Sequence, residues 1–565
     1  MSIWSSIAYK LREIIHKMIG AKTVEQTLKV APTISSQMEN AIQLWADMYG
    51  DKSPWLHEPS YNDPSRVVSL GLPAMIASEK ARTALIELAS EITAPMEDVE
   101  VDNPNYKAAT PNELGILIPT AEPKTITVQR PKGNVKRAEY LNKQYEKLKK
   151  DLRKQIEYGI AKGGIVFKPY VVINEVDGDA PQIEIEFDYI QADAFYPLTF
   201  DAANRITEAA FIQTKTEKET IYRRLEYHKW EKNSVTIINR AFKSINNNTS
   251  LMADIDLGHE IPLADVPEWS GLQPETTIKN VTRPLFAYFK MPEANTVDTN
   301  SPLGVSGYSR AVNLIRDADI QYSRLLWEYE AGEIAINVDR DAFTYLEDAQ
   351  GTEHTVLKPL QNRLYRRMDI SADELFEPFA PTLRDANYTD GLNTILMRIE
   401  DVCGISRGTL SDSIDIARTA TELKILKQRS FQTNVDIQAA IQTTLEDVIY
   451  IMNVYCTLYN ITPEGEYDVS FEWDDSLIID MDAELEKRIV LQQNGIVSKI
   501  ENRMWYFGET ERQAQEAITK IDEEQRKATE NDLVRETNEI MKRRLAREFS
   551  QRRNYGEREN KQPQP

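Results

Sequence analysis

The longest regular pattern of hydrophobic and polar positions follows Arg418. This spacing is typical of an amphipathic helix with one face to bury. At 1.5 Å per residue, a helix over 418–460 is roughly 60 Å long. Because one compact domain does not need such a helix, we predict that it crosses a large assembly or passes between neighbouring subunits. The apolar positions are Leu423, Leu426, Phe431, Val435, Ile441, Leu445, Val448, Met452, Tyr455 and Tyr459.

Before this helix the chain mixes the helical period with strand-like alternation, which predicts an α+β fold class. Proline is absent between Pro381 and Pro463 and between Pro463 and Pro563, so the second half favours long helices. The early pattern predicts helices over 35–49, 73–92 and 139–160. β-branched, aromatic and alternating residues predict strands over 165–173, 183–187, 208–214, 221–227 and 234–241, the last closing an antiparallel group.

A different order begins at Pro302, where two helical patterns flank a short insert. The first carries a stripe from Tyr308 to Tyr329 and stops near Gly332, and the second covers 388–403. Two helices around an insert predict a stalk with a head. The remaining segments are a strand over 334–338 that opens the insert, a loop over 404–417, a strand over 467–473 and a helical block over about 481–549.

Composition narrows the possible functions. A length of 565 residues with 41% hydrophobic residues predicts three or four structural regions. The formal net charge of −22 argues against tight DNA binding by the whole surface, because an acidic surface repels phosphate. Only Cys403 and Cys456 are present, which excludes a disulfide framework and a four-cysteine zinc site. Both are interpreted as packing residues in a reducing compartment.

Residues 1–20 form an amphipathic pattern without the cleavage site of a signal peptide. Such a helix docks on its own protein, on a partner or on a membrane surface, and the sequence leaves these alternatives open. No window approaches 18 consecutive apolar residues, so no stable membrane insertion is expected.

One motif suggests a hydrolase. Gly404-Ile405-Ser406-Arg407-Gly408 matches G-x-S-x-G, which requires the serine on a turn between a strand and a helix. The residues before it have helical spacing, and no histidine follows His354. The usual order of serine, acid and histidine is therefore missing, and a flexible loop is the preferred interpretation.

Other motifs are weaker still, and no cofactor or metal is predicted. Gly159 to Gly164 lacks the Lys-Ser/Thr of a phosphate loop and is interpreted as a helix end and tight turn. Asp474 and Asp475, with Asp480 and Asp482, offer oxygen ligands for Mg²⁺, but a turn with helix-capping residues is favoured. The histidines have no i,i+4 pair.

Two groups of basic residues stand out against the acidic average. One lies in the insert, and the other lies in the segment 541–565, where eight Lys or Arg face three Glu. Solvated faces explain both, and contact with nucleic acid or an acidic partner is the functional alternative. The basic residues of the insert are Lys358, Arg363, Arg366 and Arg367.

In order along the chain, these features resemble the portal proteins of tailed bacteriophages, in particular those of siphophages of Gram-positive bacteria. Each matching stretch is weak alone, but their order covers nearly the whole chain. The stretches are 45–49 with 54–56, 72–74 with 77–82, 163–170, 192–197, 284–290, Gly404-Ile405-Ser406 and Arg418-Thr419-Ala420-Thr421-Glu422.

The resemblance implies a dodecameric ring at one capsid vertex, through which DNA enters and leaves without sequence-specific contacts. It implies partners as well, namely the terminase large subunit, a head-tail adaptor, and the major capsid and scaffolding proteins, with a stage in the host cytoplasm before the virion. The alternatives are a cytosolic scaffold or adaptor and a nuclease or hydrolase. Transferred onto this chain, the family plan is a wing over 1–304, a stem helix over 305–332, a small α/β clip over 333–384, a second stem helix over 385–403, a tunnel loop over 404–417, the long wing helix and a strand over 418–475, a helical crown over 476–553 and a disordered tail over 554–565.

The same resemblance assigns residues to DNA contact and to partner docking, and it assigns none to catalysis. The loop would place some of its side chains against DNA, while the basic residues of the insert would dock the packaging motor. Sparse phosphate contacts from Arg407 or Arg418 would centre the duplex without reading its sequence. The candidate tunnel-loop residues are Ser406, Arg407, Thr409, Ser411, Ser413 and Arg418, and the candidate clip residues are Lys358, Arg363, Arg366 and Arg367.

Overall fold

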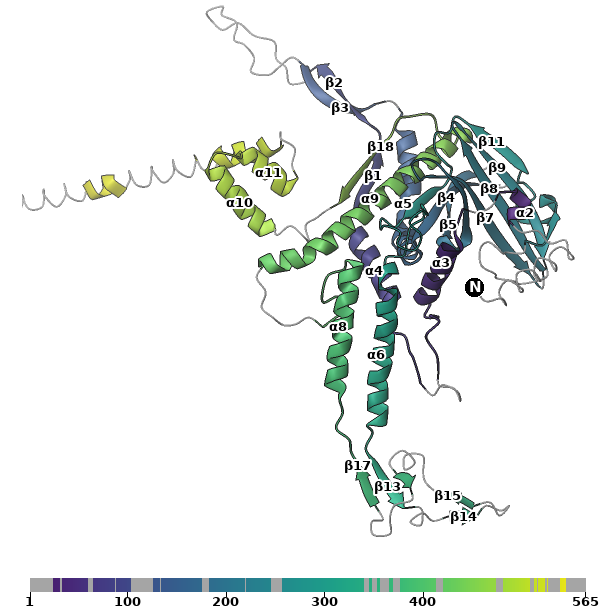
Figure 1. Cartoon of the computed structure of the whole chain (residues 1–565). Helices are drawn as coiled ribbons and strands as arrows, with labels where there is room; N and C mark the ends of the chain where they lie inside the picture. Colours follow the sequence, from purple (N-terminus) through teal and green to yellow (C-terminus); the bar gives the residue numbers. More distant parts are fainter. Residues whose placement is uncertain are drawn as a thin grey trace, which may run out of the picture. The chain divides into compact units, whose positions relative to one another are not determined.

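The computed structural model describes residues 24–30, 33–58, 65–86, 88–102, 125–132, 134–174, 182–218, 220–244, 257–339, 345–347, 353–355, 365–368, 376–412, 420–473, 481–508, 513–515, 517–523, 526 and 539–544. They belong to two compact units, Met1–Asp474 and Asp475–Pro565, each described by itself below. Helices alternate with several separate sheets (Figure 1), which confirms the α+β fold class.

Helix α5 (Lys136–Lys162) lies at the centre of the first unit. Its buried residues follow the helical period, from Leu141 and Tyr145 to Ile156 and Ile160. They pack in one core with residues of the sheet β12 (Ala287–Lys290), β4 (Gly164–Asn174) and β5 (Gln182–Gln191), which is antiparallel throughout. The predicted helix 139–160 and strand 165–173 are therefore both confirmed and are slightly longer than predicted.

The turn from α5 into β4 depends on glycine. Gly163 ends the helix with a φ of 89°, a left-handed conformation that disfavours other residues. A Cβ atom added to Gly163 would lie 2.6 Å from the carbonyl oxygen of Gly304. These glycines thus serve the backbone, which confirms the interpretation of 159–164 as a helix end and tight turn.

An antiparallel sheet forms the second layer of the first unit, in the order β10-β9-β8-β7-β6, with β11 also on β9. The three central strands are long hairpin neighbours, which confirms the predicted antiparallel group. Their bounds are β6 (Phe195–Phe200), β7 (Ile206–Glu217), β8 (Thr220–Glu231), β9 (Ser234–Ser244), β10 (His259–Ile261) and β11 (Glu275–Lys279).

A charged cluster is buried where this sheet meets the core. The Glu226 carboxylate on β8 receives Lys168 Nζ at 2.9 Å, Arg224 Nη2 at 2.8 Å and His228 Nε2 at 2.7 Å. Burial by itself raises the pKa of Glu226, but these partners together hold that pKa well below its ordinary value. The His228 pKa is lowered, chiefly by burial, so its imidazole is neutral near pH 7.

The predicted helix over 73–92 is wrong in its second half. Helix α4 (Leu72–Leu85) ends early, and β1 (Leu88–Thr93) pairs antiparallel with β18 (Asp468–Trp473). Ser90 on β1 also shares a 2.8 Å hydrogen bond with the hydroxyl of Tyr145. The partner strand is distant in sequence, so a local helical pattern gave no sign of it.

Two helices, α6 (Val312–Ala331) and α8 (Asp385–Cys403), lie side by side (Figure 1), as the stalk prediction requires. Arg384 joins them by an ion pair with Glu328 at 2.7 Å. The first predicted helix begins later than the expected residue 305. Tyr308 is fully buried there and donates a 2.8 Å hydrogen bond to the carbonyl of Trp45, which holds the chain in the core.

Short strands occupy the insert between these helices. β13 (Ala335–Asp339) pairs in parallel with β16 (Tyr365–Met368) and antiparallel with β17 (Phe376–Phe379), while β14 (Tyr345–Glu347) pairs with β15 (Glu353–Thr355). The first unit also contains α2 (Val24–Leu28), α3 (Ser36–Tyr49), β2 (Met96–Asp102) and β3 (Thr125–Pro131). Helix α3 agrees with the prediction over 35–49, and Ser35 caps its first turn.

Helix α9 (Ala420–Leu458) confirms the long helix of the sequence prediction. Ile441, Leu445, Val448, Met452 and Tyr455 are buried on the stripe read from the sequence. This part of the helix packs on α4, α5, β4 and β12. The helix is therefore anchored in the core of its own unit through its second half.

In the second unit, the described residues include α10 (Met481–Gln493) and α11 (Lys499–Phe507). Ser498 and Glu501 form a capping box that starts α11, so the predicted helical block is interrupted by a turn.

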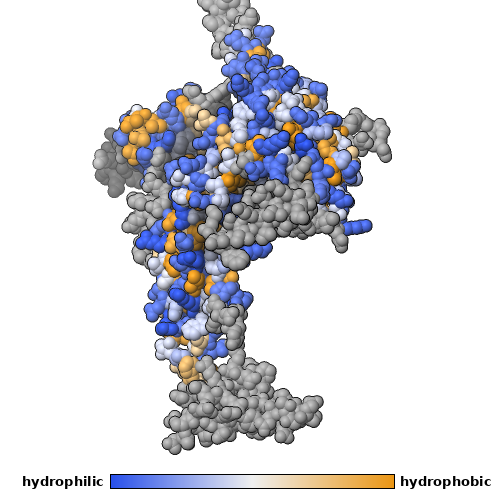
Figure 2. Space-filling view, turned by 45° about the vertical axis from the view of Figure 1, so that its right-hand side comes forward, coloured by the Kyte–Doolittle hydropathy of each residue, from blue (hydrophilic) through white to orange (hydrophobic). Residues whose placement is uncertain are grey.

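No described helix is both long and apolar enough to cross a membrane. Figure 2 shows a mostly hydrophilic surface with small groups of apolar residues, in keeping with the acidic composition.

Candidate functional site

The candidate site is the segment between α8 and α9, of which the structure describes 404–412. Helix α8 ends at Gly404, which has a left-handed φ of 68° and donates its N–H to the carbonyl of Glu400. A Cβ atom on Gly404 would lie 2.5 Å from Thr433 Oγ1 on α9. The segment thus begins where the end of α8 touches α9.

One buried carboxylate organises this segment. Glu400 has no exposed surface. Its Oε1 accepts the N–H groups of Leu410 at 2.6 Å and Ser411 at 2.9 Å, and its Oε2 accepts the Ser411 hydroxyl at 2.8 Å. Hydrogen bonds to an ionised group are stronger than neutral ones, so this contact fixes the returning chain firmly against α8.

The adjacent acid, Asp401, holds the outer side of the segment. Arg407 forms a two-point ion pair with it, at 3.1 Å from Nε to Oδ1 and 2.7 Å from Nη2 to Oδ2. The Arg407 side chain is 41% exposed, and its hydrogen bond to Asp401 raises its pKa. The only basic side chain among 404–412 is therefore at the surface and already paired.

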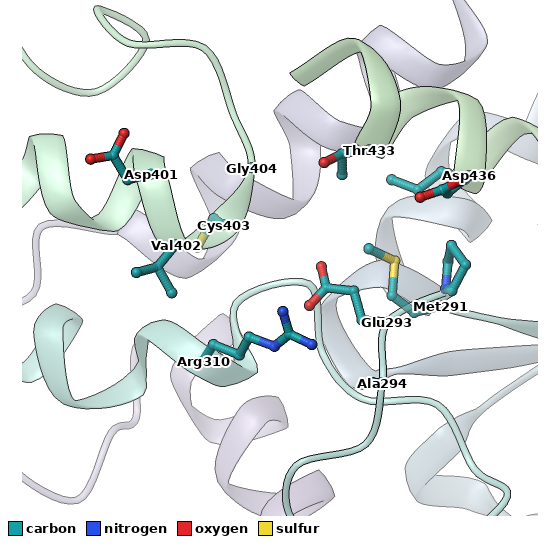
Figure 3. Close-up of a pocket in the computed structure, with 12 residues that line it drawn as sticks. Met291, Glu293, Ala294, Arg310, Asp401, Val402, Cys403, Gly404, Thr433 and Asp436 are labelled. Atoms are coloured by element: carbon teal, nitrogen blue, oxygen red, sulfur yellow. The ribbon is translucent and has the colours of Figure 1, made fainter. Parts of the chain in front are cut away.

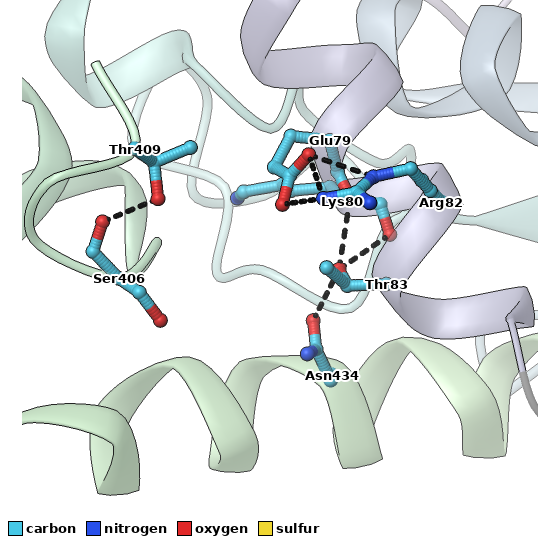
Figure 4. Close-up of polar contacts among 7 residues, drawn as sticks. All are labelled: Glu79, Lys80, Arg82, Thr83, Ser406, Thr409 and Asn434. Carbon is cyan, nitrogen blue, oxygen red and sulfur yellow. Dashed lines mark hydrogen bonds and ion pairs between the residues drawn. The ribbon is translucent and has the colours of Figure 1, made fainter. Parts of the chain in front are cut away.

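A tight turn shapes the tip of the segment. The Thr409 hydroxyl donates a 2.6 Å hydrogen bond to the carbonyl oxygen of Ser406, as Figure 4 shows. The Gly408 N–H donates to Ser411 Oγ at 3.3 Å. The described residues therefore form an ordered turn with local hydrogen bonds.

The predicted site residues have different environments. Ser406 and Thr409 are half-buried, Arg407 is exposed and Ser411 is buried at 7% exposure. Arg366 and Arg367 lie on β16. The other predicted residues lie outside the described part of the chain, namely Ser413, Arg418, Lys358 and Arg363.

The structure shows whether Ser406 of the G-x-S-x-G motif lies on the turn that a hydrolase requires. Ser406 follows a helix and a helix end, whereas a nucleophile elbow follows a strand. The interpretation of G-x-S-x-G as a loop is therefore confirmed, but residues 404–412 form a hydrogen-bonded turn rather than the expected flexible loop. Among the described residues, no group of three or more acidic, His or Cys side chains is placed to hold a metal, and Asp474, Asp475 and Asp480 lie outside them.

A pocket of about 390 Å³ adjoins the start of the segment. Figure 3 shows Arg310 extending toward Glu293 on one side, with Asp401 and Asp436 on the others. Cys403 also lines it, and burial raises the pKa of its thiol to about 12, which keeps the thiol protonated. Sequence reasoning missed Glu293 and Arg310, because nothing in their local pattern connects them with the loop.

Side chains of α4 hold the chain before α6 and also contact α9. Lys80 is buried and donates to Glu293 Oε1 and to the carbonyl of Gly307, both at 2.9 Å. The Thr83 hydroxyl donates to Asn434 Oδ1 at 3.1 Å across to α9 (Figure 4). Side chains far apart in sequence thus fix the helix that follows the segment.

The comparison with known families agrees with this architecture of sheets, paired helices, insert and long helix. A family model described as "Phage portal protein, SPP1 Gp6-like" matches residues 121–531. The chain therefore belongs to the SPP1 Gp6-like family of phage portal proteins. The search among curated proteins finds no match.

Membership of this family establishes a role in viral DNA packaging and a place in the virion capsid. It also implies an oligomeric ring that assembles with the capsid and the terminase, and a structural rather than an enzymatic kind of protein. The resemblance to portal proteins of siphophages of Gram-positive bacteria is confirmed. Serine chemistry and a metal site are not needed for this role.

Proposed function

We propose that twelve copies form a ring whose channel passes double-stranded DNA during packaging and ejection, and that the segment 404–417 faces that DNA. The observation that carries the proposal is the anchored turn at the end of α8, which exposes Arg407 beside Asp401. Such a turn offers one basic side chain per subunit at a fixed place. The ring itself performs no catalysis.

The regional plan of the family gives the other parts their roles. Residues 1–304 with the long helix and strand of 418–475 form the wing, and 305–332 with 385–403 form the stem. The clip covers 333–384 and the crown covers 476–553, while the tail expected over 554–565 lies outside the described residues. The contacts of α6 with α8 and of α9 with the central core support this division.

Charge explains how the ring can guide DNA without holding it. Each subunit contributes a formal charge of −22, so most of the assembled surface repels phosphate. Arg407 is already paired with Asp401, and a phosphate must compete with that carboxylate. The contact is therefore weak and independent of sequence, which suits a duplex that must move.

The clip residues Lys358, Arg363, Arg366 and Arg367 dock the terminase large subunit and, after packaging, the head-tail adaptor. The remaining partners are the major capsid and scaffolding proteins, with assembly in the host cytoplasm. The basic residues of the clip support docking against an acidic partner surface.

A replacement in the turn tests the DNA-facing role. Residues 406–409 are replaced by Gly-Ser-Gly-Gly, which leaves Gly408 with its left-handed φ of 85° and leaves Glu400 as the acceptor for Leu410 and Ser411. We expect rings of normal size by electron microscopy but strongly reduced packaged DNA. The matched control replaces the exposed turn 201–204 in the same way and should package normally. Normal packaging by the 406–409 variant would refute the role.

Charge reversal tests the clip role. Arg366→Glu with Arg367→Glu should weaken binding of the terminase large subunit to purified rings by at least about tenfold, because two contacts become repulsive. Arg240→Glu, an exposed reversal on β9, is the control. Unchanged terminase binding in the double variant would show that the clip arginines do not dock the motor.

A further inference from the structure

Both ends of the segment 404–412 form hydrogen bonds with one residue of α8, Glu400. Near its start, the Ile405 N–H donates to the Glu400 carbonyl at 3.1 Å. At its end, the N–H groups of Leu410 and Ser411 donate to the Glu400 carboxylate. One residue therefore sets the spacing between the two ends of the turn.

Burial of the Glu400 carboxylate costs free energy. An ionised carboxylate loses its hydration when it is buried, and it is tolerated only with compensating hydrogen bonds. Glu400 has no exposed surface, and within the described part of the chain its carboxylate receives three hydrogen bonds, from Leu410 and Ser411. A buried apolar residue on α8 would fill the space, but it would leave the two loop N–H groups without these acceptors.

We propose that Glu400 is a positioning residue that fixes the turn 404–412 and thereby presents Arg407 to the channel. Ser411 belongs to this anchor and is not a DNA contact. The inference rests on the proposed DNA-facing role of the loop. It assigns the two adjacent acids different tasks, since Glu400 holds the backbone and Asp401 holds the Arg407 side chain.

Two features of the geometry support this division of tasks. Asn393, two turns earlier on α8, accepts the Asp412 N–H at 2.9 Å, so the end of the turn is held along the same helix. Arg407 lies between the two anchored ends, and its guanidinium reaches back to Asp401. If the anchor is removed, the turn gains conformational freedom and Arg407 loses its fixed place.

Graded substitutions separate the anchor from general folding. In Glu400→Gln, the amide oxygen can still accept the two N–H groups and the amide nitrogen can donate to Ser411 Oγ, so most of the geometry survives. Glu400→Ala removes all three bonds, and Ser411→Ala removes one. Asp390→Ala changes an exposed acid on the same helix and is the control.

The first measurement is hydrogen exchange of the Leu410 and Ser411 amides in purified full-length rings. Glu400→Ala should exchange at least about tenfold faster, because both amides lose their acceptor. Glu400→Gln should lie between the wild type and Glu400→Ala, and Asp390→Ala should match the wild type. Unchanged exchange in Glu400→Ala rings would overturn the anchor. Should Glu400→Ala fail to form rings, Glu400→Gln and Ser411→Ala decide the question by the same criterion.

The second measurement is packaged DNA per particle. Glu400→Ala should lower it to the level of Arg407→Ala, Glu400→Gln should restore most of it, and Glu400→Ala with Arg407→Ala should be no worse than either alone. Additive losses would show that Glu400 does not act through Arg407. Faster exchange with normal packaging would overturn the DNA-facing role of the loop, while the structural anchor would stand.

Discussion

The second half of α9 and the turn 404–412 are held in place by different forces. Leu445, Ile441 and Val448 on α9 are buried among apolar side chains of α4, α5 and the central sheet. The turn is held by hydrogen bonds to Glu400 and by the pair between Arg407 and Asp401. The helix depends on apolar area removed from water, whereas the turn adds Ile405 and Leu410 to the same core and depends mostly on the placement of a few polar atoms.

This difference teaches where stability and function can be changed separately. Loss of an apolar contact in the core weakens the whole unit, because neighbouring elements share the core. Loss of the partly exposed pair between Arg407 and Asp401 changes the turn and leaves the core intact. Core substitutions should therefore lower the free energy of unfolding more than they lower the amount of packaged DNA. Substitutions in the turn should do the reverse.

The largest effect is expected for Leu445→Ala. The side chain is 1% exposed, and its truncation leaves a cavity in the shared core. We expect a loss of about 4 kcal/mol in the free energy of unfolding, measured by denaturant unfolding of the purified protein. Thr443→Ala, at an exposed position of the same helix, should change it by less than about 0.5 kcal/mol. Equal effects at the two positions would contradict the assignment of the buried face.

A smaller and pH-dependent effect is expected for Glu226→Gln. Its pKa is held well below the ordinary value, so the ionised form stabilises the fold at neutral pH. We expect a loss of roughly 3 kcal/mol at pH 7, because Arg224 and Lys168 lose the Glu226 carboxylate, although Lys168 keeps its pair with Asp188 at 3.3 Å. The wild type loses this advantage as the pH falls below about 4, where the unfolded chain takes up protons before the folded one does. The difference between the two proteins should therefore shrink in acid.

Thermal unfolding midpoints of both proteins at pH 7 and pH 3 test this expectation. Glu217→Gln, a half-exposed glutamate paired with Lys215 on the same sheet, is the control and should show a small difference at either pH. A constant difference between Glu226→Gln and the wild type across the range would mean that the cluster does not depend on the charge of Glu226.

The smallest effect on stability is expected for Arg407→Ala. Its pair with Asp401 is partly exposed, so the free energy of unfolding should fall by less than about 1 kcal/mol. Packaged DNA per particle should nevertheless drop, since the turn then offers no basic group. Arg205→Ala removes a comparable exposed pair far from the loop in sequence and should affect neither quantity strongly. A large loss in the free energy of unfolding of Arg407→Ala would show that this pair stabilises the whole unit, as the core contacts of α9 do.

The sequence predicts those features that depend on local pattern. The stripe through Leu445 and the strand over 165–173 are readable because burial repeats at the period of the element. The pairing of β1 with β18 is not readable, because its partner is distant and its own apolar spacing also fits a helix. For the site, G-x-S-x-G marks a loop and Arg407 can be named. Glu400 cannot be named from the sequence, because a glutamate on a helix is ordinarily exposed. Only the folded loop shows which groups it binds.

The pairing of β1 with β18 has a consequence for how the chain is made. Ser470 on β18 lies 379 positions after Glu91, its neighbour on β1. At synthesis rates of about 5–20 residues per second, the ribosome needs roughly 20 to 75 seconds between these two points. Throughout that time β1 is without its partner strand, and an unpaired strand is a template for wrong pairing. The pairing that joins β1 to the first unit can therefore form only after β18 has been synthesised, so for that time other parts of the chain must keep β1 from wrong pairing.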